Sequence, residues 1–218
     1  MVTTTTNERF NSLNPSSCLV ITAHPDDETL WAGGIILMRP QWNWLVACLS
    51  RKNDNERCDR FHQALEKLNA RGAIGDLDDS PKQHPVDMSD LKERIISLIG
   101  FTSSDLILTH SIWGEYTYHR RHEEIGRAVL ELWKENRLQT PNLWVFAYED
   151  GNGTYLPRPI ANAHLMIPLP QDVWGKKYDM ITNTYGFTQD KFEARVTPKI
   201  EAFFWFTTPE AMETYFKE

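Results

Sequence analysis

Residues 18–28 read CLVITAHPDDE, and this stretch says more about the chain than any other. Its first part, Cys18-Leu19-Val20-Ile21, is continuously apolar, as expected of a strand that helices cover on both faces of a parallel sheet. Its second part places one histidine and two adjacent aspartates directly after that strand, at the sheet edge where α/β proteins bind ligands. The stretch therefore predicts a buried first strand followed by a loop that carries half of a polar site.

The chain up to about residue 150 alternates such apolar runs with helical patterns. Apolar residues recur between the runs at three- and four-residue spacing, as at Phe61, Leu65 and Leu68. This alternation is typical of an α/β fold with a doubly wound, mostly parallel sheet. We expect its strands at Cys18–Ala23, Trp44–Leu49, Ala73–Leu77, Asp105–Thr109 and Leu143–Tyr148.

The pattern changes after residue 148, where glycines and prolines interrupt short runs. Residues 160–167 read as an edge strand or a hairpin. The cluster Phe203-Phe204-Trp205-Phe206 is too apolar to leave exposed, so it belongs to the core or to a subunit contact. Because no linker separates the two parts, we expect one domain over 1–218, with a core at about 15–150 and a hairpin-containing cap at about 151–218.

Composition limits the classes of molecule that the protein is expected to bind. The net charge is −7 and the basic residues are scattered, which argues against binding to nucleic acid or an anionic membrane. No apolar run approaches the roughly 20 residues of a membrane span, and residues 1–14 lack an apolar signal core. Three cysteines suit buried reduced thiols. We expect a cytoplasmic protein that binds a small polar molecule, and its oligomeric state stays open.

A pair of histidines supplies the second half of the candidate site. His119 and His122 stand at i and i+3 where a helix is predicted to begin, so both side chains can lean toward one pocket. Each motif alone has an ordinary interpretation, the acidic run as a helix cap and the histidines as a solvated helix face. Together they favour a metal, because two imidazoles and one carboxylate are a ligand set of catalytic zinc.

One division of roles follows if His24, Asp27 and His122 hold Zn²⁺. Asp26 is then left as an unligated carboxylate that can take a proton from water. His119 is free to stabilise a developing oxyanion or to protonate a departing amine. All of these roles are hypotheses at this point.

At these residues the chain resembles the LmbE-like (PIG-L) zinc-dependent N-deacetylase family. The motif His24-Pro25-Asp26-Asp27-Glu28 and the later His119-x-x-His122 are similar to the signature of that family, and the resemblance covers roughly residues 18–149. It implies a Rossmann-like fold and removal of acetyl groups from N-acetylglucosamine-type molecules. It also implies zinc ligands at His24, Asp27 and His122, a general base at Asp26 and an assisting histidine at His119.

Two features depart from the family's pattern. Members commonly have Pro-Asp between the paired histidines, and that aspartate charges the first histidine, whereas Arg120-Arg121 stand here. Members also often carry a tyrosine two residues before that histidine, but position 117 is Thr, with Tyr116 and Tyr118 on either side. The sequence therefore leaves open the charge of His119 and which tyrosine, if either, polarises the acyl oxygen.

The function that follows is a hydrolase that removes an acetyl group from an N-acetylated amino sugar or its conjugate. One alternative is a metal-dependent phosphoesterase, since consecutive aspartates also hold harder cations. Another is a non-catalytic sugar-binding module. Weaker site candidates are Arg51, which follows the second strand, and Asp76, Asp78 and Asp79, which follow the third. A solvated loop is the simpler interpretation of these residues. Packing under its loop explains His110 as well as a site role does. His164 is better explained as an exposed histidine of an edge strand than as a site residue.

Overall fold

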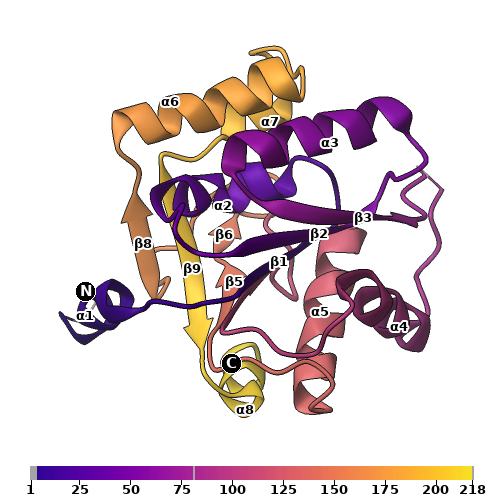
Figure 1. The fold of residues 1–218 in the computed structure, drawn as a ribbon, viewed down its shortest axis with the longest axis vertical. Helices are drawn as coiled ribbons and strands as arrows, with labels where there is room; N and C mark the ends of the chain where they lie inside the picture. The colour runs from indigo at the N-terminus through magenta and orange to yellow at the C-terminus, as the bar shows by residue number, and fades with distance from the viewer. Residues whose placement is uncertain (1–3, 81, 218) are drawn as a thin grey trace.

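A seven-stranded sheet runs through the molecule in the order β3-β2-β1-β4-β5-β9-β8 (Figure 1). The computed structural model describes residues 4–80 and 82–217. The first five strands of this order are parallel, and the order 3-2-1-4-5 is that of the Rossmann fold. The predicted fold class is confirmed, and the predicted strands end within two residues of the observed ones. They are β1 (Cys18–Thr22), β2 (Trp44–Ser50), β3 (Arg71–Leu77), β4 (Leu106–Thr109) and β5 (Leu143–Phe146).

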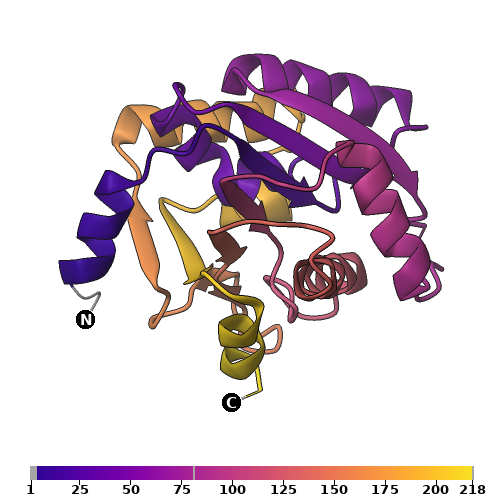
Figure 2. The same cartoon turned by 60° about the horizontal axis from the view of Figure 1, so that its bottom comes forward.

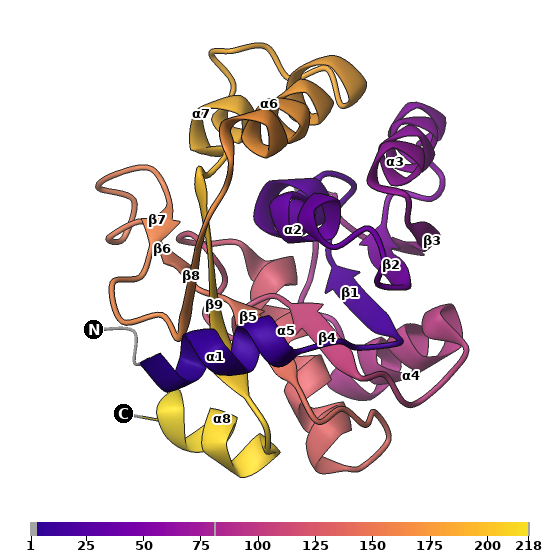
Figure 3. The same cartoon turned by 60° about the vertical axis from the view of Figure 1, so that its left-hand side comes forward.

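Helices cover both faces of this sheet (Figure 3). α2 (Asp27–Met38) and α3 (Asn55–Leu68) lie on one face, and α4 (Met88–Ile99) and α5 (Arg120–Lys134) on the other. In α5, which Figure 2 shows end-on, Ile125, Val129 and Leu132 are buried at spacings of four and three residues, whereas Arg127 is exposed. This amphipathic spacing is the reason why the segment forms a helix that packs on the sheet.

The segment after residue 150 extends the same sheet. β9 (Ile200–Phe206) pairs antiparallel with β5, and β8 (Leu165–Pro168) pairs antiparallel with β9 and forms the edge. β6 (Tyr148–Glu149) and β7 (Arg158–Pro159) form a separate small ribbon. The cluster Phe203–Phe206 is at most 7% exposed and so belongs to the core. β9 is not predictable from the sequence, because a short run of aromatic residues does not distinguish a strand from a buried helix.

The remaining helical segments pack on the elements already described, α6 on α2 and α8 on α5. α1 packs on β9, where Arg9 of α1 lies 4.0 Å above the ring of Trp205. In the described part of the chain, none of the helices combines the length and the apolarity needed to cross a membrane. The segments are α1 (Thr4–Ser12), α6 (Gln171–Asp179), a π-helical turn (Met180–Thr184), α7 (Phe192–Val196) and α8 (Pro209–Tyr215).

A buried ion pair joins the C-terminal segment to α2. Lys177 on α6 donates to Glu201 on β9 at 2.6 Å, and both side chains are completely buried. The Glu201 carboxylate also accepts the backbone N–H groups of Gly34 and Ile35 in α2, at 2.6 and 2.7 Å. A Cβ at position 34 would lie 2.4 Å from Leu169 Cδ2 and 2.8 Å from Glu201 Oε1, so glycine at this position leaves room for the buried carboxylate. The Glu201 carboxylate therefore has partners on both oxygens and holds α2, α6 and β9 together.

Replacing Lys177 with Met should lower the free energy of unfolding by about 3–5 kcal/mol, because the buried charge of Glu201 would lose its partner. Denaturant unfolding measures this change. Lys176→Met, at the exposed neighbouring position, should stay within about 0.5 kcal/mol of the wild type. If both variants unfold at the denaturant concentration of the wild type, the pair does not stabilise the fold.

Candidate metal centre

The two predicted motifs meet at the carboxyl ends of β1 and β4. These strands are neighbours in the sheet, and the helices that follow them lie on opposite faces, which makes this edge the topological switch point. The loop after β1 carries His24, Asp26 and Asp27, and α5 begins directly after His119. The structure brings these residues together around a pocket of about 200 Å³. His122 is buried behind the pocket, with its Nε2 3.3 Å from His24 Nδ1.

Three donor atoms of this group stand at equal distances from one another. His24 Nδ1, Asp27 Oδ2 and His122 Nε2 are each 3.3 Å from the other two. A tetrahedral metal ion with bonds of about 2.0 Å to nitrogen and oxygen spaces its ligand atoms about 3.3 Å apart. The three atoms therefore fit one face of the coordination shell of a divalent metal such as zinc.

Carboxylates behind the two histidines determine which ring nitrogen faces the centre. Asp79 Oδ1 lies 3.0 Å from His24 Nε2, and Glu115 Oε2 lies 2.6 Å from His122 Nδ1. A neutral imidazole carries its proton on the nitrogen that faces a carboxylate. The lone pairs of His24 Nδ1 and His122 Nε2 therefore face each other and Asp27, an arrangement that a shared cation stabilises.

The charges around the centre also favour a cation. Burial opposes protonation of His24, but hydrogen bonds to Asp27 and Asp79 outweigh it and raise the pKa of His24 to about 10. Burial would raise the pKa of Asp27, yet the adjacent His122 and His110 hold that pKa well below its usual range. The carboxylates thus stabilise positive charge at the point where the donor atoms converge.

Two members of the centre were not identified from the sequence. Glu115 is completely buried, and its carboxylate accepts hydrogen bonds from the rings of His110 and His122 and from the Ser111 N–H. Burial would raise its pKa, but the two imidazoles lower the pKa of Glu115 to about 2. His110 stacks on His122 with ring centroids 3.8 Å apart, and its Nε2 accepts the Ala23 N–H. No local pattern marks Glu115, whereas the position of His110 directly after β4 was a usable signal.

Asp26 stands beside the centre in a strained backbone conformation. Its φ of 121° lies in a region that side-chain-bearing residues rarely adopt. Arg57 Nη1 lies 3.3 Å from Asp26 Oδ2, and Glu28 accepts the Asp26 N–H at 3.1 Å. Burial and the adjacent Asp27 raise the pKa of Asp26 well above its usual range, against the charge of Arg57. A carboxyl group with a raised pKa is suited to accept and return a proton near neutral pH.

His119 lies next to the centre without a carboxylate partner. Its ring centroid is 3.7 Å from that of His122 and 4.8 Å from that of His24. Its buried Nδ1 has no hydrogen-bond partner among the described residues. Burial and the neighbouring charges of His122 and His24 lower the pKa of His119 to about 2. This environment favours a neutral imidazole, whose N–H can donate a hydrogen bond to an oxyanion.

The two tyrosines on either side of Thr117 have different surroundings. The ring of Tyr116 packs edge-on against His119, 4.9 Å between centroids, and lines the small pocket. Tyr118 is 95% exposed. Of the two, Tyr116 is the tyrosine positioned to meet a group bound in the small pocket.

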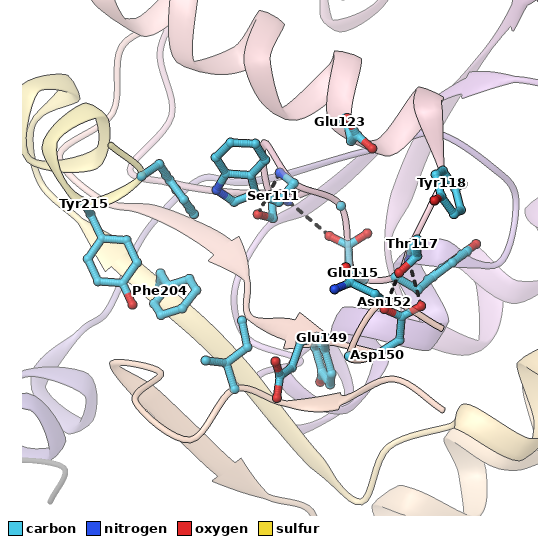
Figure 4. Close-up of a pocket in the computed structure, with 17 residues that line it drawn as sticks. Ser111, Glu115, Thr117, Tyr118, Glu123, Glu149, Asp150, Asn152, Phe204 and Tyr215 are labelled. Atoms are coloured by element: carbon cyan, nitrogen blue, oxygen red, sulfur yellow. Dashed lines mark hydrogen bonds between the residues drawn. The ribbon is translucent and has the colours of Figure 1, made fainter. Parts of the chain in front are cut away.

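Tyr116 also lines a second, larger pocket of about 700 Å³ (Figure 4). The exposed rings of Trp113 and Tyr118 contribute to its wall, together with several carboxylates. The carboxylate of Asp150 accepts the backbone N–H and the hydroxyl of Thr117, at 2.7 and 2.5 Å, and so fixes the loop that both pockets share. The larger pocket offers aromatic surfaces for stacking and oxygens that accept hydrogen bonds.

The weaker candidates divide into two groups. Asp79 lies within the centre through its contact with His24, and Arg51 binds Asp79 through two nitrogens. His164 is half-buried, its Nδ1 accepts the Trp205 N–H at 2.9 Å, and it lines neither pocket. The loop after β3 therefore contributes to the site, whereas the predicted hairpin does not contribute His164.

Comparison with known proteins gives one family and several similar structures. The sequence model of the PIG-L family, described as GlcNAc-PI de-N-acetylase, matches residues 19–133. The uncharacterized protein L374 of Acanthamoeba polyphaga mimivirus is 26% identical over an alignment of 147 positions that covers 60% of this chain. The chain thus spans 61% of the length of that curated relative.

Two of the similar solved structures belong to different kinds of enzyme. N,N'-diacetylchitobiose deacetylase from Pyrococcus horikoshii has a TM-score of 0.66 at 14% identity, with 92% of each chain covered. The 4-carboxy-2-hydroxymuconate hydratase GalB from Pseudomonas putida has a TM-score of 0.61 at 16% identity, covering 87% of this chain and 95% of that one. At such identities the likeness shows the fold alone, and the reaction has to be argued from the site.

Replacing Glu115 with Gln should weaken binding of a divalent metal about 10- to 100-fold, because the amide cannot accept charge-assisted hydrogen bonds from both imidazoles. Competition with a chelator at neutral pH measures the affinity. Glu123→Gln serves as the control for metal affinity, because Glu123 pairs with Arg127 and lines the larger pocket, whereas it does not line the small pocket. Wild-type affinity in Glu115→Gln would contradict the role given to this carboxylate.

Proposed function

Because this chain belongs to the PIG-L family, we propose that it is a zinc-dependent N-deacetylase that removes the acetyl group from an N-acetylated amino sugar or a conjugate of one. The observation that carries the proposal is the triangle of His24 Nδ1, Asp27 Oδ2 and His122 Nε2, with Asp26 beside it. The family's description supports amide hydrolysis, and the fold shared with the diacetylchitobiose deacetylase supports a sugar substrate.

In this proposal His24, Asp27 and His122 hold Zn²⁺, which when bound polarises the acetyl carbonyl and lowers the pKa of water to about 7. Asp26 removes a proton from the attacking water, and Arg57 keeps its carboxylate in place. The acyl oxygen gains negative charge as the water oxygen attacks the carbonyl carbon. The N–H of neutral His119 stabilises this charge by a hydrogen bond.

The departing amine needs a proton, because an amide anion is a very poor leaving group. The surroundings of His119 favour its neutral form, so in this proposal Asp26 returns the proton that it took from water. The C–N bond then breaks, and the products are acetate and a free amine. Of the two roles considered for His119, the proposal therefore keeps oxyanion stabilisation.

We place the acetamido group in the small pocket and the remainder of a conjugate in the larger one, because Tyr116 lines both. The phosphoesterase alternative is less well supported. Two imidazoles and one carboxylate match the ligand preferences of zinc, whereas the harder cations of many phosphoesterases prefer oxygen ligands.

The adjacent aspartates should differ sharply when each is replaced by Asn. Asp26→Asn should retain zinc and lose about 10²- to 10⁴-fold in turnover, the usual contribution of a general base. Asp27→Asn should lose zinc as well, because it removes one of three protein ligands. Elemental analysis and amine release measure the two effects. Equal loss of metal in both variants, or near-normal turnover of Asp26→Asn, would mean that the roles are reversed or that the mechanism is wrong.

Wild-type protein offered zinc and then dialysed should retain it stoichiometrically and release equal amounts of acetate and amine from at least one N-acetylglucosamine-containing compound. His122→Ala should lose both properties. The assay runs N-acetylated sugars and phosphomonoesters in parallel. Phosphate without amine would favour the phosphoesterase, zinc retention without turnover would favour the binding module, and no zinc retention would refute the metal site.

A further inference from the structure

The mechanism gives no role to the two arginines between the paired histidines, yet one of them is buried. Arg121 is 1% exposed. Its guanidinium donates to the backbone carbonyls of Asp78 at 2.7 Å and His84 at 3.1 Å, and it pairs with Glu124. A planar guanidinium with several partners in fixed directions holds them more rigidly than a lysine would. Arg121 thus clamps the first turn of α5 to the β3–α4 loop, the segment between Leu77 and Met88.

Neighbouring residues of α5 strengthen this link. Arg120, which is exposed, donates to the backbone carbonyl of Gln83 at 2.7 Å. The second carboxylate oxygen of Glu124 accepts the backbone N–H of Val86 at 3.1 Å. The first turn of α5 therefore contacts the β3–α4 loop at several points along its length.

The β3–α4 loop carries Asp79, which contacts the first histidine of the site. Asp79 Oδ1 lies 3.0 Å from His24 Nε2, while Asp79 Oδ2 accepts from Arg51 Nη2 and Nε at 2.6 and 3.0 Å. Arg51 directly follows β2 and has a φ of 72°, so its backbone takes the left-handed conformation. Asp79 is thus held by Arg51 through its side chain and by Arg121 through the backbone of the preceding residue.

We infer that Arg121 and Asp79 are positioning residues of the metal centre. Arg121 fixes the β3–α4 loop, the loop presents Asp79 to His24, and Asp79 keeps the His24 Nδ1 lone pair directed at Asp27 and His122. The inference rests on the proposed function and names residues that tune its metal site. It also means that one turn of α5 serves both sides of the centre, because it supplies His122 directly and supports His24 through the loop.

Zinc affinity, measured by competition with a chromophoric chelator, tests this inference without any need for turnover. Asp79→Asn and Arg121→Met should each bind zinc about 10- to 100-fold more weakly, the usual effect of losing the partner of a ligating histidine. The double variant should bind zinc as well as the single variant with the lower zinc affinity, because both changes act through the contact between Asp79 and His24. Arg127→Met, an exposed arginine of the same helix, is the matched control and should bind as the wild type does.

Several outcomes would overturn the inference. Wild-type zinc affinity in Asp79→Asn would overturn it. If that variant binds zinc normally but has a raised KM, Asp79 contacts the substrate and does not position the metal ligand. If the two losses of zinc affinity multiply in the double variant, Arg121 does not act through Asp79. If Arg121→Met does not fold, Arg51→Met replaces it, because Arg51 also holds Asp79 and its side chain is 42% exposed, so that the variant should fold. Wild-type zinc affinity in Arg51→Met would show that binding of Asp79 by its arginine partner does not support the metal site.

The same measurements separate this inference from the proposed function. A wild-type protein that retains no zinc contradicts the proposed function itself. A wild-type protein that binds zinc, with variants that bind it equally well, leaves the proposed function intact and removes only the positioning roles.

Discussion

The hydrogen bonds behind the two histidines are the interactions on which the rest of the site depends. Asp79 faces the outer nitrogen of His24, and Glu115 faces the outer nitrogen of His122. Each carboxylate fixes a proton on the side of the ring that it faces, so the inner nitrogens present lone pairs beside Asp27. A change of tautomer or of ring orientation at either histidine would remove one donor from the triangle. The geometry is therefore a property of five side chains.

The C-terminal half of the chain supports the loop that carries Asp26. Glu28 is buried, accepts the Asp26 N–H, and accepts the hydroxyl of Tyr185 at 2.7 Å. These bonds help to hold Asp26 at its positive φ, a conformation that persists only where the surroundings determine it. The buried bonds from Glu201 to Gly34 anchor the same helix farther along. The segment beyond residue 150 thus contributes to the site through α2 as well as completing the sheet.

In the proposed reaction the arginine pair and the proton transfers are connected. His119 Nδ1 has no hydrogen-bond partner among the described residues. Burial and the charges of His122 and His24 outweigh the effect of Asp27 and disfavour the protonated form of His119. Proton transfer then falls to Asp26, whose pKa is raised by burial and by Asp27. The side chains of Arg120 and Arg121 instead bind the loop that carries Asp79.

The sequence by itself determined the fold class, the five parallel strands and the five candidate residues around the pocket. Those signals are local, because apolar runs, helical spacing and a histidine after a strand are visible within a few residues. Only the tertiary structure decided that β9 lies beside β5. It also decided that Asp79 contacts His24 and that Glu115 contacts both His122 and His110. The physical reason is that a hydrogen bond needs two atoms within about 3 Å, and sheet order and loop paths set that distance for residues far apart in the chain.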